Sequence, residues 1–563
     1  GTGGGTGTGG GTGTGGGTGT GGGTGTGGGT GTGGGTGTGG GTGTGGSGGG
    51  VVLGPDGGVI GIAGPDGGLV ILPDGGVAGG PCLPSQCSEI VCNDGIDNDG
   101  NGRADCNEAS CTGQTCQDGD PCTGGERCSG ATCTPARRTT CPAPTNSCQG
   151  NAYCVNEQCV YPVLVGSPCG SSGMGCLPDA TCGTLPGSGQ FSFTPSNFDP
   201  GQIGLTPGDV YTPGGGTVTV NTNTGALQGN WGSLNPTATT VMTSTGPAVV
   251  IASRNFTLAA GSVLQVVGSN PLIIAASETI EIHGVIDVSA VGQTPGPGGH
   301  RGCGTSAGGD GSLGTNSAAG GGGAGGSQSA GGMGGGGSTF LGGGGGTAGT
   351  VLSRGAEELK GGCPGGRGGN GGGLGGAGGG AIQLTAGYGL GVGPTGAIIA
   401  NGSGGLGGNR TSGTYSPQGG GGGGSGGTII LESAFVFADQ SRLLANGGGG
   451  GEGSGWANFP GANGFDGDKV YGLLGAAGGS GASGNGGNGG NGGARYSQPG
   501  NGQNGWQYDD GNSNFWESAG GGGGGAAGAL RIHITTSLGR CIFPDNVKFS
   551  PHLTTNSADR CYQ

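Results

Sequence analysis

The sequence is poor in charge, aromatic side chains and histidine. Charged residues make up 9% of its 563 residues, aromatic residues 4%, and only 4 residues are His. With 17 basic and 32 acidic residues the net charge is −15, which argues against nucleic acid as a partner, because phosphate binding needs clustered cations. The low charged fraction also argues against disorder driven by charge repulsion.

Long apolar runs are absent too. No run approaches the ~20 residues that span a bilayer, so no transmembrane segment is expected. The first residue lies inside a Gly-Thr repeat and no initiator Met precedes it, so we expect that an export signal has been removed.

Glycine and cysteine are abundant instead. Gly occupies 170 positions, but no Gly-X-Y register exists and Pro numbers only 29, which excludes a collagen triple helix. Of the 20 Cys residues, 16 lie between Cys82 and Cys182. This density is typical of a disulfide framework in an oxidising location. Zinc binding is the alternative, but C-x-x-C pairs and neighbouring His residues are missing.

Composition shifts divide the chain into five parts. Residues 1–50 are a low-complexity Gly/Thr repeat, which we interpret as a disordered, flexible tether. Residues 51–80 contain Pro-Asp-Gly-Gly three times and predict a jointed stalk or short β-hairpins. The remaining parts are a disulfide-rich module at residues 81–183, a β-solenoid at residues 184–540, and a C-terminal tail at residues 541–563, closed by a disulfide between Cys541 and Cys561.

Cysteine spacing repeats inside the disulfide-rich module. Two sets share one pattern and a third begins it: Cys116, Cys122, Cys128 and Cys133; Cys141, Cys148, Cys154 and Cys159; and Cys169, Cys176 and Cys182. The first group, before these sets, contains five cysteines and the last set contains three, and both numbers are odd. Pairing within each group therefore leaves one cysteine over in each. A bridge between these two groups is one solution. The connectivity stays open, because spacing alone does not determine it.

Strand periodicity begins at about residue 184. The stretch PLIIAASETIEIHGVIDVSAVG, residues 271–292, alternates apolar and polar residues with short breaks. Similar stretches start at Gly380, Gly427 and Gly528, and each full copy holds two or three short strands in roughly two dozen residues. That length suits one coil of a parallel β-solenoid, so the sequence predicts an all-β fold of stacked coils.

Gly-rich insertions interrupt the coils at about residues 293–379, 402–426 and 447–527. They leave after Ala-Asn-Gly or Val-Ser-Ala and return before Gly-x-Ile or Gly-x-Leu, so they start at one corner of the coil and must lie side by side. Without Cβ atoms, polyproline-II segments can pack backbone to backbone, and we interpret the insertions as such polyglycine sheets. Flexible loops are the alternative. A disulfide between Cys303 and Cys363 would staple the first insertion.

Several stretches resemble a known group of proteins. FTPSNFDP, NPLIIAASETIEIHGVIDVSA, GGGGGGSGGTIILES and LLANGGGGGEG are similar to exported glycine-rich β-solenoid surface proteins of myxobacteria. CNDGIDNDGNGRADC is similar to a Cys-rich metal-binding motif in surface proteins of those bacteria. The resemblance covers roughly residues 85–563 and implies a secreted or outer-surface protein, often a lipoprotein, without an assigned activity. The acylated cysteine of a lipoprotein is not in this sequence, which leaves the mode of anchoring open.

Catalytic motifs are scarce. Glycine-loop motifs arise by chance in so much Gly, H-E-x-x-H is absent, and the His residues are scattered. We therefore expect a non-enzymatic secreted or cell-surface structural or adhesive protein, with surface polysaccharide or other matrix proteins as partners.

A polysaccharide-binding or polysaccharide-cleaving β-solenoid is the main alternative, and an ice- or surface-binding protein with Thr rows is another. Cleavage needs carboxylates and basic residues grouped on one groove. The candidates alternate instead with apolar residues, as on solvated faces: Glu278, Glu281, Asp287, Glu432, Asp439 and Arg442.

Aromatic residues gather beside carboxylates in the last insertion. Their rings can stack on sugars, and the carboxylates can accept hydroxyl protons. The candidate ligand-binding residues are Trp456, Trp506, Tyr508, Asp509, Asp510 and Trp516. The sequence favours the other interpretation, in which these rings cap the Gly-rich sheets and shield them from water.

A calcium-type loop lies in DNDGNGRADCNE, residues 97–108, which matches D-x-[DN]-x-[DN]-G-x5-E without a gap. The predicted ligands are the side chains of Asp97, Asp99, Asn101, Asp105 and Glu108 and the carbonyl oxygen of Arg103. Hard oxygen ligands at this spacing favour Ca²⁺. Cys92 and Cys106 would hold the loop, because the flanks are too short for the helices of an EF-hand. An acidic turn without an ion is the alternative.

Calcium is therefore expected to bind this module and to stiffen it. Isothermal titration of residues 81–183 should show an affinity in the weak extracellular range of about 10⁻⁴–10⁻³ M, and Asp97→Ala and Glu108→Gln should each weaken binding. Absence of heat or stabilisation up to ~10 mM Ca²⁺ would contradict the site. Equal binding by both variants and the wild type would contradict it as well.

Overall fold

The computed structural model contains two compact units, Gly1–Thr139 and Thr140–Gln563. The structure describes residues 6–8, 12–14, 18–20, 24–26, 30–32, 37–38, 50–53, 59–63, 92, 103, 105–107, 109–116, 122–155, 158–161, 163–164, 169–170, 174–177, 180–184, 191, 193–203, 208–232, 236–314, 318–338, 342–353, 355, 358–409, 417–455, 459–470, 472–481, 486–495, 497–509, 515–535, 540–543, 547–555 and 561–562. In these residues nearly all regular structure is strand and no α-helix occurs, which confirms the all-β prediction there.

Short parallel strands form in the Gly-Thr repeat of the first unit. They are β1 (Thr6–Thr8), β2 (Thr12–Thr14), β3 (Thr18–Thr20), β4 (Thr24–Thr26), β5 (Thr30–Thr32) and β6 (Gly37–Thr38). The odd-numbered strands pair in one set and the even-numbered strands in another, with Thr6 opposite Thr18 and Thr18 opposite Thr30. This arrangement differs from the predicted flexible tether, because a six-residue repeat lets every second Thr-Gly-Thr segment pair in register.

A hairpin and a disulfide-rich segment follow. β7 (Gly50–Leu53) pairs antiparallel with β8 (Val59–Ala63), as in the hairpin alternative for the first Pro-Asp-Gly-Gly turn. The next elements are η1 (Asp105–Asn107), η2 (Ala109–Cys111), β9 (Thr123–Gly124), β10 (Arg127–Ser129), β11 (Thr132–Thr134) and β12 (Arg137–Arg138). The disulfides Cys92–Cys111, Cys106–Cys128 and Cys116–Cys133 stand here in place of an apolar core.

The second unit begins with further disulfides. Its first strands are β13 (Tyr153–Val155), β14 (Gln158–Val160), β15 (Met174–Cys176) and β16 (Cys182–Thr184). The bridges are Cys141–Cys159, Cys148–Cys176 and Cys169–Cys182. Cys106–Cys128 links the first five cysteines to the first set, and Cys148–Cys176 links the second set to the third. A bridge from the first five cysteines to the last three is not among the described disulfides.

Two large sheets make up most of the regular structure in the second unit. The 12-stranded sheet contains β17 (Val210–Thr212), β20 (Ala238–Thr243), β21 (Gly246–Ser253), β22 (Phe256–Leu258), β24 (Leu272–Ala276), β25 (Thr279–Ile282), β27 (Ala381–Val392), β29 (Thr428–Ala438), β33 (Ala529–Ile534), β34 (Arg540–Ile542), β36 (Leu553–Thr555) and β37 (Cys561–Tyr562). The 7-stranded sheet contains β18 (Thr217–Asn221), β19 (Ala226–Gln228), β23 (Val263–Val267), β26 (Val285–Asp287), β28 (Ala397–Ile399), β30 (Arg442–Leu444) and β35 (Lys548–Ser550). The second unit also contains two 3-10 turns, η3 (Pro200–Gln202) and η4 (Gly304–Ser306).

Strands far apart in the sequence stack in parallel and in register. One row of the larger sheet consists of Ile274, Leu384, Leu431 and Ile532, on β24, β27, β29 and β33. One row of the smaller sheet consists of Ile286, Ile398, Leu443 and Phe549. These apolar side chains from both sheets belong to one buried core. The Gly-rich insertions therefore leave and re-enter between strands that are neighbours in space.

The two ends of the stack differ. At one end, β20 pairs antiparallel with β21, and β19 pairs antiparallel with β18. At the other end, β36 and β37 extend the larger sheet in parallel. Cys541 is disulfide-bonded and lies opposite Cys561 in the strand register; the side chain of Cys561 lies outside the described residues.

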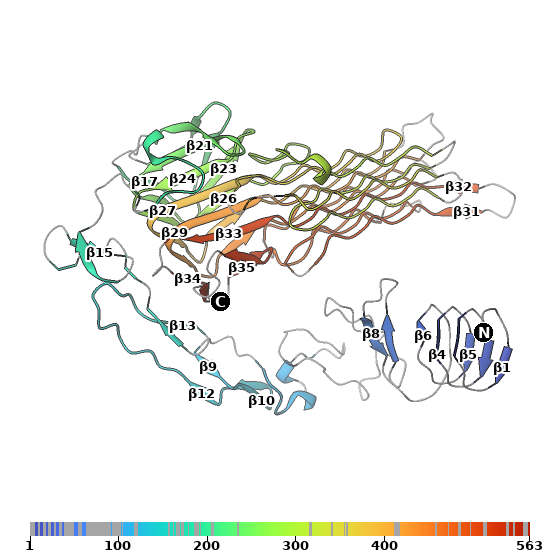
Figure 1. The fold of residues 1–563 in the computed structure, drawn as a ribbon, viewed down its shortest axis with the longest axis horizontal. Helices are drawn as coiled ribbons and strands as arrows, with labels where there is room; N and C mark the ends of the chain where they lie inside the picture. Colours follow the sequence, from blue (N-terminus) through green and yellow to red (C-terminus); the bar gives the residue numbers. More distant parts are fainter. Residues whose placement is uncertain are drawn as a thin grey trace. The chain divides into compact units, whose positions relative to one another are not determined.

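The insertions run away from the sheets as extended segments that lie side by side (Figure 1). We call residues 304–380, 400–427 and 445–528 the Gly layer. A central segment of this layer has six neighbours: the N–H groups of Gly321, Gly322 and Gly323 donate to Gly335, Gly420 and Gly309, and their carbonyls accept from Gly346, Gly523 and Gly366. Three successive residues thus point to different neighbours, which is the three-residue repeat of a polyproline-II helix.

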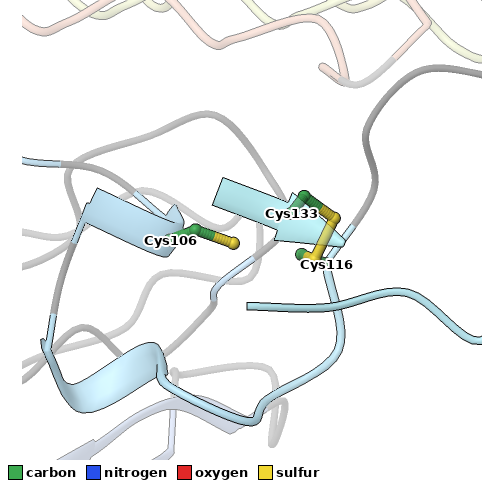
Figure 2. A group of neighbouring side chains, drawn as sticks. All are labelled: Cys106, Cys116 and Cys133. Carbon is green, nitrogen blue, oxygen red and sulfur yellow. A yellow bond between two sulfur atoms is a disulfide. The ribbon is translucent and has the colours of Figure 1, made fainter. Parts of the chain in front are cut away.

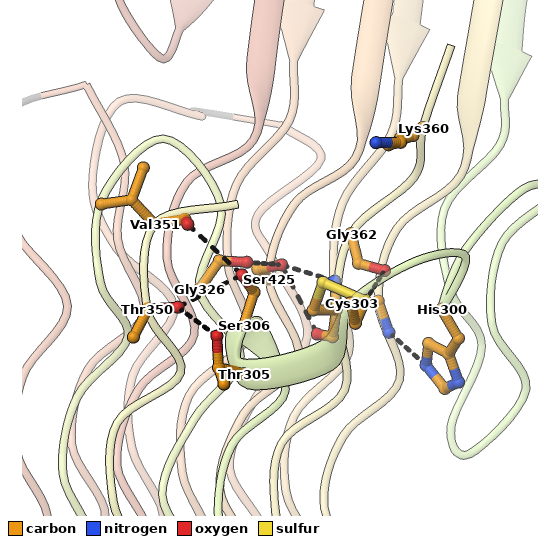
Figure 3. Close-up of a disulfide and its surroundings, with 12 residues drawn as sticks. His300, Cys303, Thr305, Ser306, Gly326, Thr350, Val351, Lys360, Gly362 and Ser425 are labelled. Carbon is orange, nitrogen blue, oxygen red and sulfur yellow. Dashed lines mark hydrogen bonds between the residues drawn. A yellow bond between two sulfur atoms is a disulfide. The ribbon is translucent and has the colours of Figure 1, made fainter. Parts of the chain in front are cut away.

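One disulfide fastens the first insertion (Figure 3). Cys303 and Cys363, separated by 60 residues, are joined and buried. Closing a loop of this length contributes about 4 kcal/mol through loop entropy. The Cys363 N–H donates to Ser425 Oγ at 2.8 Å. The nearby His300 accepts the N–H of Gly378 through its Nε2 atom at 3.0 Å. Burial lowers the pKa of His300.

A ladder of polar side chains lines the corner where the insertions leave the sheets. Ser289 Oγ accepts the N–H of Asn401 at 3.2 Å, and Asn401 Oδ1 accepts the N–H of Asn446 at 2.7 Å. Ser550 Oγ donates to Asn446 Oδ1. The ladder gives the Val-Ser-Ala and Ala-Asn-Gly exit sequences a physical role, because it satisfies buried backbone groups at each exit.

Packing in the Gly layer predicts a contrast between two glycine substitutions. A Cβ at Gly423 would lie 2.1 Å from the carbonyl oxygen of Gly448, whereas a Cβ at Gly344 would meet only Ser312 Oγ, 3.5 Å away. Gly423→Ala should therefore lower the free energy of unfolding by about 1–3 kcal/mol, as overpacking does. Gly344→Ala should leave it within about 0.5 kcal/mol. Equal melting temperatures of the two variants in calorimetry would contradict this packing.

Candidate functional site

A hairpin stands at the end of the Gly layer that lies farthest from the two large sheets (Figure 1). β31 (Gln507–Asp509) pairs antiparallel with β32 (Phe515–Glu517), and Tyr508 lies opposite Trp516. Trp506, directly before β31, is 65% exposed. Its N–H donates to Ser518 Oγ at 2.7 Å, and that hydroxyl donates to its carbonyl at 2.8 Å, so the two arms of the hairpin are joined at the base.

Other turns of the Gly layer meet at the base of this hairpin. The backbone N–H donors and their acceptors are Ala318 to Glu517 Oε2, Ser338 to the Ser518 carbonyl, Ala319 to the Pro417 carbonyl, and Ala519 to the Ser454 carbonyl. Residues 318, 338, 417 and 454 each adjoin a connection between segments of the layer. Described residues beside four connections therefore meet the base of the hairpin at one end of the layer.

The structure describes some of the predicted ligand-binding residues and not others. Trp506 is described in full, and the backbone of Tyr508, Asp509 and Trp516 forms the hairpin. Trp456 and Asp510 lie outside the described residues. The carbonyl oxygen of Ser454, two positions before Trp456 in the sequence, accepts the N–H of Ala519 at the base of the hairpin.

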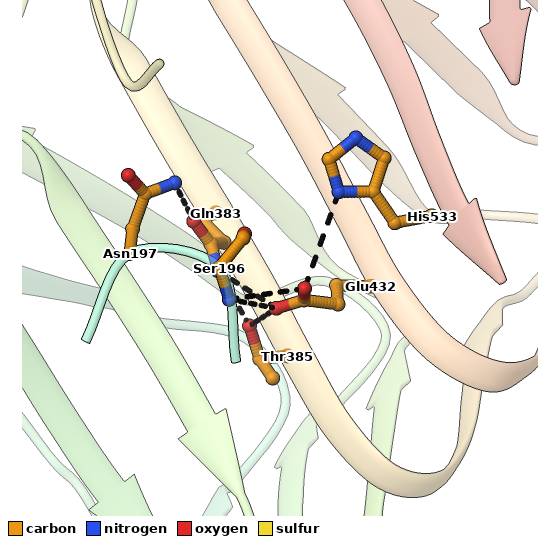
Figure 4. A network of polar contacts seen from close by, with 6 residues as sticks. All are labelled: Ser196, Asn197, Gln383, Thr385, Glu432 and His533. Atoms are coloured by element: carbon orange, nitrogen blue, oxygen red, sulfur yellow. Dashed lines mark hydrogen bonds and ion pairs between the residues drawn. The ribbon is translucent and has the colours of Figure 1, made fainter. Parts of the chain in front are cut away.

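A second candidate site is a buried polar cluster on the side of the larger sheet that faces away from the main core (Figure 4). Glu432 of β29 lies between Thr385 of β27 and His533 of β33 in one row across the sheet. Its carboxylate accepts from Thr385 Oγ1 at 3.0 Å, from Gln383 Nε2 at 3.0 Å and from the Ser196 N–H at 3.1 Å. The His533 Nδ1 atom lies 4.0 Å from Glu432 Oε1.

Residues 193–203, the covering segment, lie over this cluster. Asn197 Nδ2 donates to Gln383 Oε1 at 2.7 Å, and Phe198 packs with Ile430 of β29 in a second, smaller core. Glu432 is only 3% exposed. A substrate would have to displace the covering segment to reach this carboxylate, so the arrangement acts as a clamp between the segment and the sheet.

The other carboxylates considered for catalysis do not gather around Glu432. Asp287 belongs to the smaller sheet and accepts from Lys469 Nζ at 2.8 Å. Glu281 of β25 lies 3.9 Å from His283 Nε2, and its side chain is 46% exposed. Each of these carboxylates has a partner of its own, and the structure does not place them in one group with the clamp.

Sequence reasoning missed most of this cluster. Gln383 and Thr385 are polar residues in an otherwise apolar strand, and such interruptions were a usable signal. The contact of Ser196 with Glu432 spans 236 positions, so no local pattern could have predicted it.

Most of the predicted calcium ligands lie outside the described residues. These are Asp97, Asp99, Asn101 and Glu108, whereas the backbone of Arg103 and Asp105 is described. Cys92 and Cys106, which were expected to hold the loop, form disulfides with Cys111 and Cys128. Calcium binding therefore stays a prediction.

Two groups of cysteines bring three sulfur atoms close together. They are Cys106, Cys116 and Cys133 (Figure 2), and Cys148, Cys169 and Cys176. All six are disulfide-bonded. A disulfide sulfur is not the thiolate that binds metal ions, so these groups are disulfide cores and not zinc sites.

Comparison with known proteins gives no match: no protein-family model, no curated protein and no solved structure matches the chain. Within the described residues, no helix is both long enough and apolar enough to cross a membrane. The hairpin end and the buried cluster are the two candidate functional regions of the described residues.

The clamp predicts a strong effect of a small substitution. Glu432→Gln replaces one acceptor oxygen with a donor that faces other donors, so it should lower the free energy of unfolding by about 1–3 kcal/mol. Glu281→Gln, in the same sheet with a side chain that is 46% exposed, should change it by less than about 0.5 kcal/mol. Calorimetry of the full chain measures both values, and a Glu432→Gln melting temperature equal to that of Glu281→Gln would contradict the clamp.

Proposed function

We propose that this chain is a non-enzymatic structural or adhesive protein of an extracellular or outer-surface location. The abundant disulfides support an oxidising location, and the resemblance to exported glycine-rich proteins of myxobacteria agrees with it. In this proposal the stacked parallel strands form a β-solenoid, and the Gly layer consists of polyglycine helices. In-register parallel pairing supports the first interpretation, and the three-residue hydrogen-bond repeat supports the second.

The convergence of several turns at one end of the Gly layer carries the proposal. The hairpin at this end presents the exposed indole ring of Trp506 beside polar groups such as Ser518 Oγ. The sheets hold the opposite ends of the segments, and backbone hydrogen bonds hold the segments to each other. The hairpin is therefore displayed on a stiff support, which reduces the entropy that binding would cost.

Surface polysaccharide is the partner that the hairpin end suits best. Trp506 is 65% exposed, which favours ligand binding over the alternative that this ring caps the Gly layer. An exposed indole ring can stack on a sugar ring while nearby polar groups meet its hydroxyls. Polysaccharide cleavage fits less well, because Glu432 is buried and the other strand carboxylates are dispersed over two sheets.

Loss of the indole ring tests this proposal. Trp506→Ala should weaken binding of the full chain to cellulose, chitin or acidic exopolysaccharide beads by about tenfold, the loss expected for one stacking contact of ~1.4 kcal/mol. Tyr211→Ala removes an aromatic residue of β17 that is 53% exposed, and should bind as the wild type does. Binding that Trp506→Ala leaves unchanged, or release of soluble sugars from the beads, would overturn the proposal.

A further inference from the structure

Segments at the rim of the Gly layer have N–H groups that donate to side chains and not to backbone carbonyls. In the rim segment at residues 331–338, Gly334 donates to the carbonyl of Gly346, and Gly335 donates to the carbonyl of Gly521. Met333 and Gly336 face the third direction of the three-residue repeat. No backbone carbonyl accepts from these two N–H groups in the described residues.

Side-chain carbonyls accept in that direction instead. Met333 donates to Asn501 Oδ1 at 2.8 Å, and the N–H of Gly502 donates back to the carbonyl of Met333 at 2.8 Å. Three positions on, Gly336 donates to Asn504 Oδ1 at 2.7 Å. An Asx-Gly pair thus holds the neighbouring segment through one side-chain oxygen and one backbone N–H. We call this arrangement an Asx-Gly clasp.

The clasp recurs around the rim. The further Asx acceptors and their N–H donors are Asp310 with Arg367 at 2.7 Å, Asn463 with Gly407 at 2.9 Å, Asp466 with Gly404 at 2.9 Å, and Asn491 with Gly478 at 2.9 Å. Every one of these Asx residues is exposed and precedes a Gly. Pro364 lies three positions before Arg367, where it removes the N–H that would point in the same direction.

The central segments show what the clasps replace. Gly322 sits inside the layer, and its N–H donates to the carbonyl of Gly420 on a neighbouring segment. At the rim no backbone carbonyl of the described residues lies in the direction of these N–H groups, and an Asx oxygen from an adjacent segment takes its place. Rows of unpaired backbone donors at the edge of a sheet are a template for another chain, and a rim of polyglycine has the same property.

We propose that the Asx-Gly clasps seal the rim of the Gly layer against the Gly-rich segments of a second copy of this chain. A second copy is the fitting occupant, because the close approach inside the layer is open only to backbone without Cβ atoms. A Cβ at Gly335, for example, would lie 2.0 Å from the carbonyl oxygen of Gln503. The clasps therefore prevent the rim from pairing with the Gly-rich segments of another copy.

Hydrogen exchange of the full chain tests the clasp. In a double variant with Asn501→Gly and Asn504→Gly, the amides of Met333 and Gly336 should exchange about 2- to 10-fold faster, the effect of losing one net hydrogen bond each. Gln503→Gly is the matched control: it is exposed on the same segment, and its side chain makes no hydrogen bond in the described residues. Asn501→Asp with Asn504→Asp keeps an acceptor and should preserve the protection, as Asp466 does in the native chain. Unchanged exchange in the double Gly variant would overturn the clasp.

Sedimentation velocity tests the seal. The double Gly variant should self-associate with rising concentration more than the wild type, whereas Gln503→Gly should sediment as the wild type does. If the double Gly variant does not fold, Asn501→Ala with Asn504→Ala is measured in its place. A folded clasp variant that shows faster exchange of Met333 and Gly336 but sediments as the wild type at every concentration would overturn the sealing role.

Discussion

Backbone contact without intervening side chains is the constraint on which this structure depends. In the Gly layer, N–H and carbonyl groups of separate segments lie 2.7–3.0 Å apart across most contacts, and a Cβ added at a central position such as Gly321 would lie 2.0 Å from a neighbouring carbonyl oxygen. Only glycine fits there. The same absence of side chains removes the apolar burial that stabilises ordinary folds, so hydrogen bonds and fixed segment ends must order the layer.

The stacked sheets provide those fixed ends. Their parallel rows set the spacing between consecutive insertions, since each insertion leaves and returns between strands that are neighbours in space. Ser289, Asn401 and Asn446 continue that spacing through the exit corner as a hydrogen-bonded ladder. The Cys303–Cys363 bridge fastens the first insertion close to the same corner. The sheets, the ladder and the disulfide thus offset part of the conformational entropy that the glycines lose when the Gly layer forms.

A layer built this way separates support from recognition. The buried clamp at Glu432 joins the covering segment to the larger sheet and leaves no open carboxylate there. Asx side chains accept hydrogen bonds at the rim, and glycine backbone makes up most of the interior. The far end of the layer, where the hairpin holds Trp506 exposed, is the candidate surface for a partner.

Residue patterns determined much of this architecture. Alternation in residues 271–292 indicated strands, recurrence at Gly380, Gly427 and Gly528 indicated their stacking, and the density of cysteines indicated disulfides. The common exit sequences placed the insertions at one corner. Only the tertiary structure decided which segments touch, such as Gly321 beside Gly335 and Gly335 beside Gly521, and which polar groups meet, such as Ser196 and Glu432. Neighbouring glycines carry no side chains that could distinguish one partner from another, and the order of segments in the layer follows from where the sheets hold their ends.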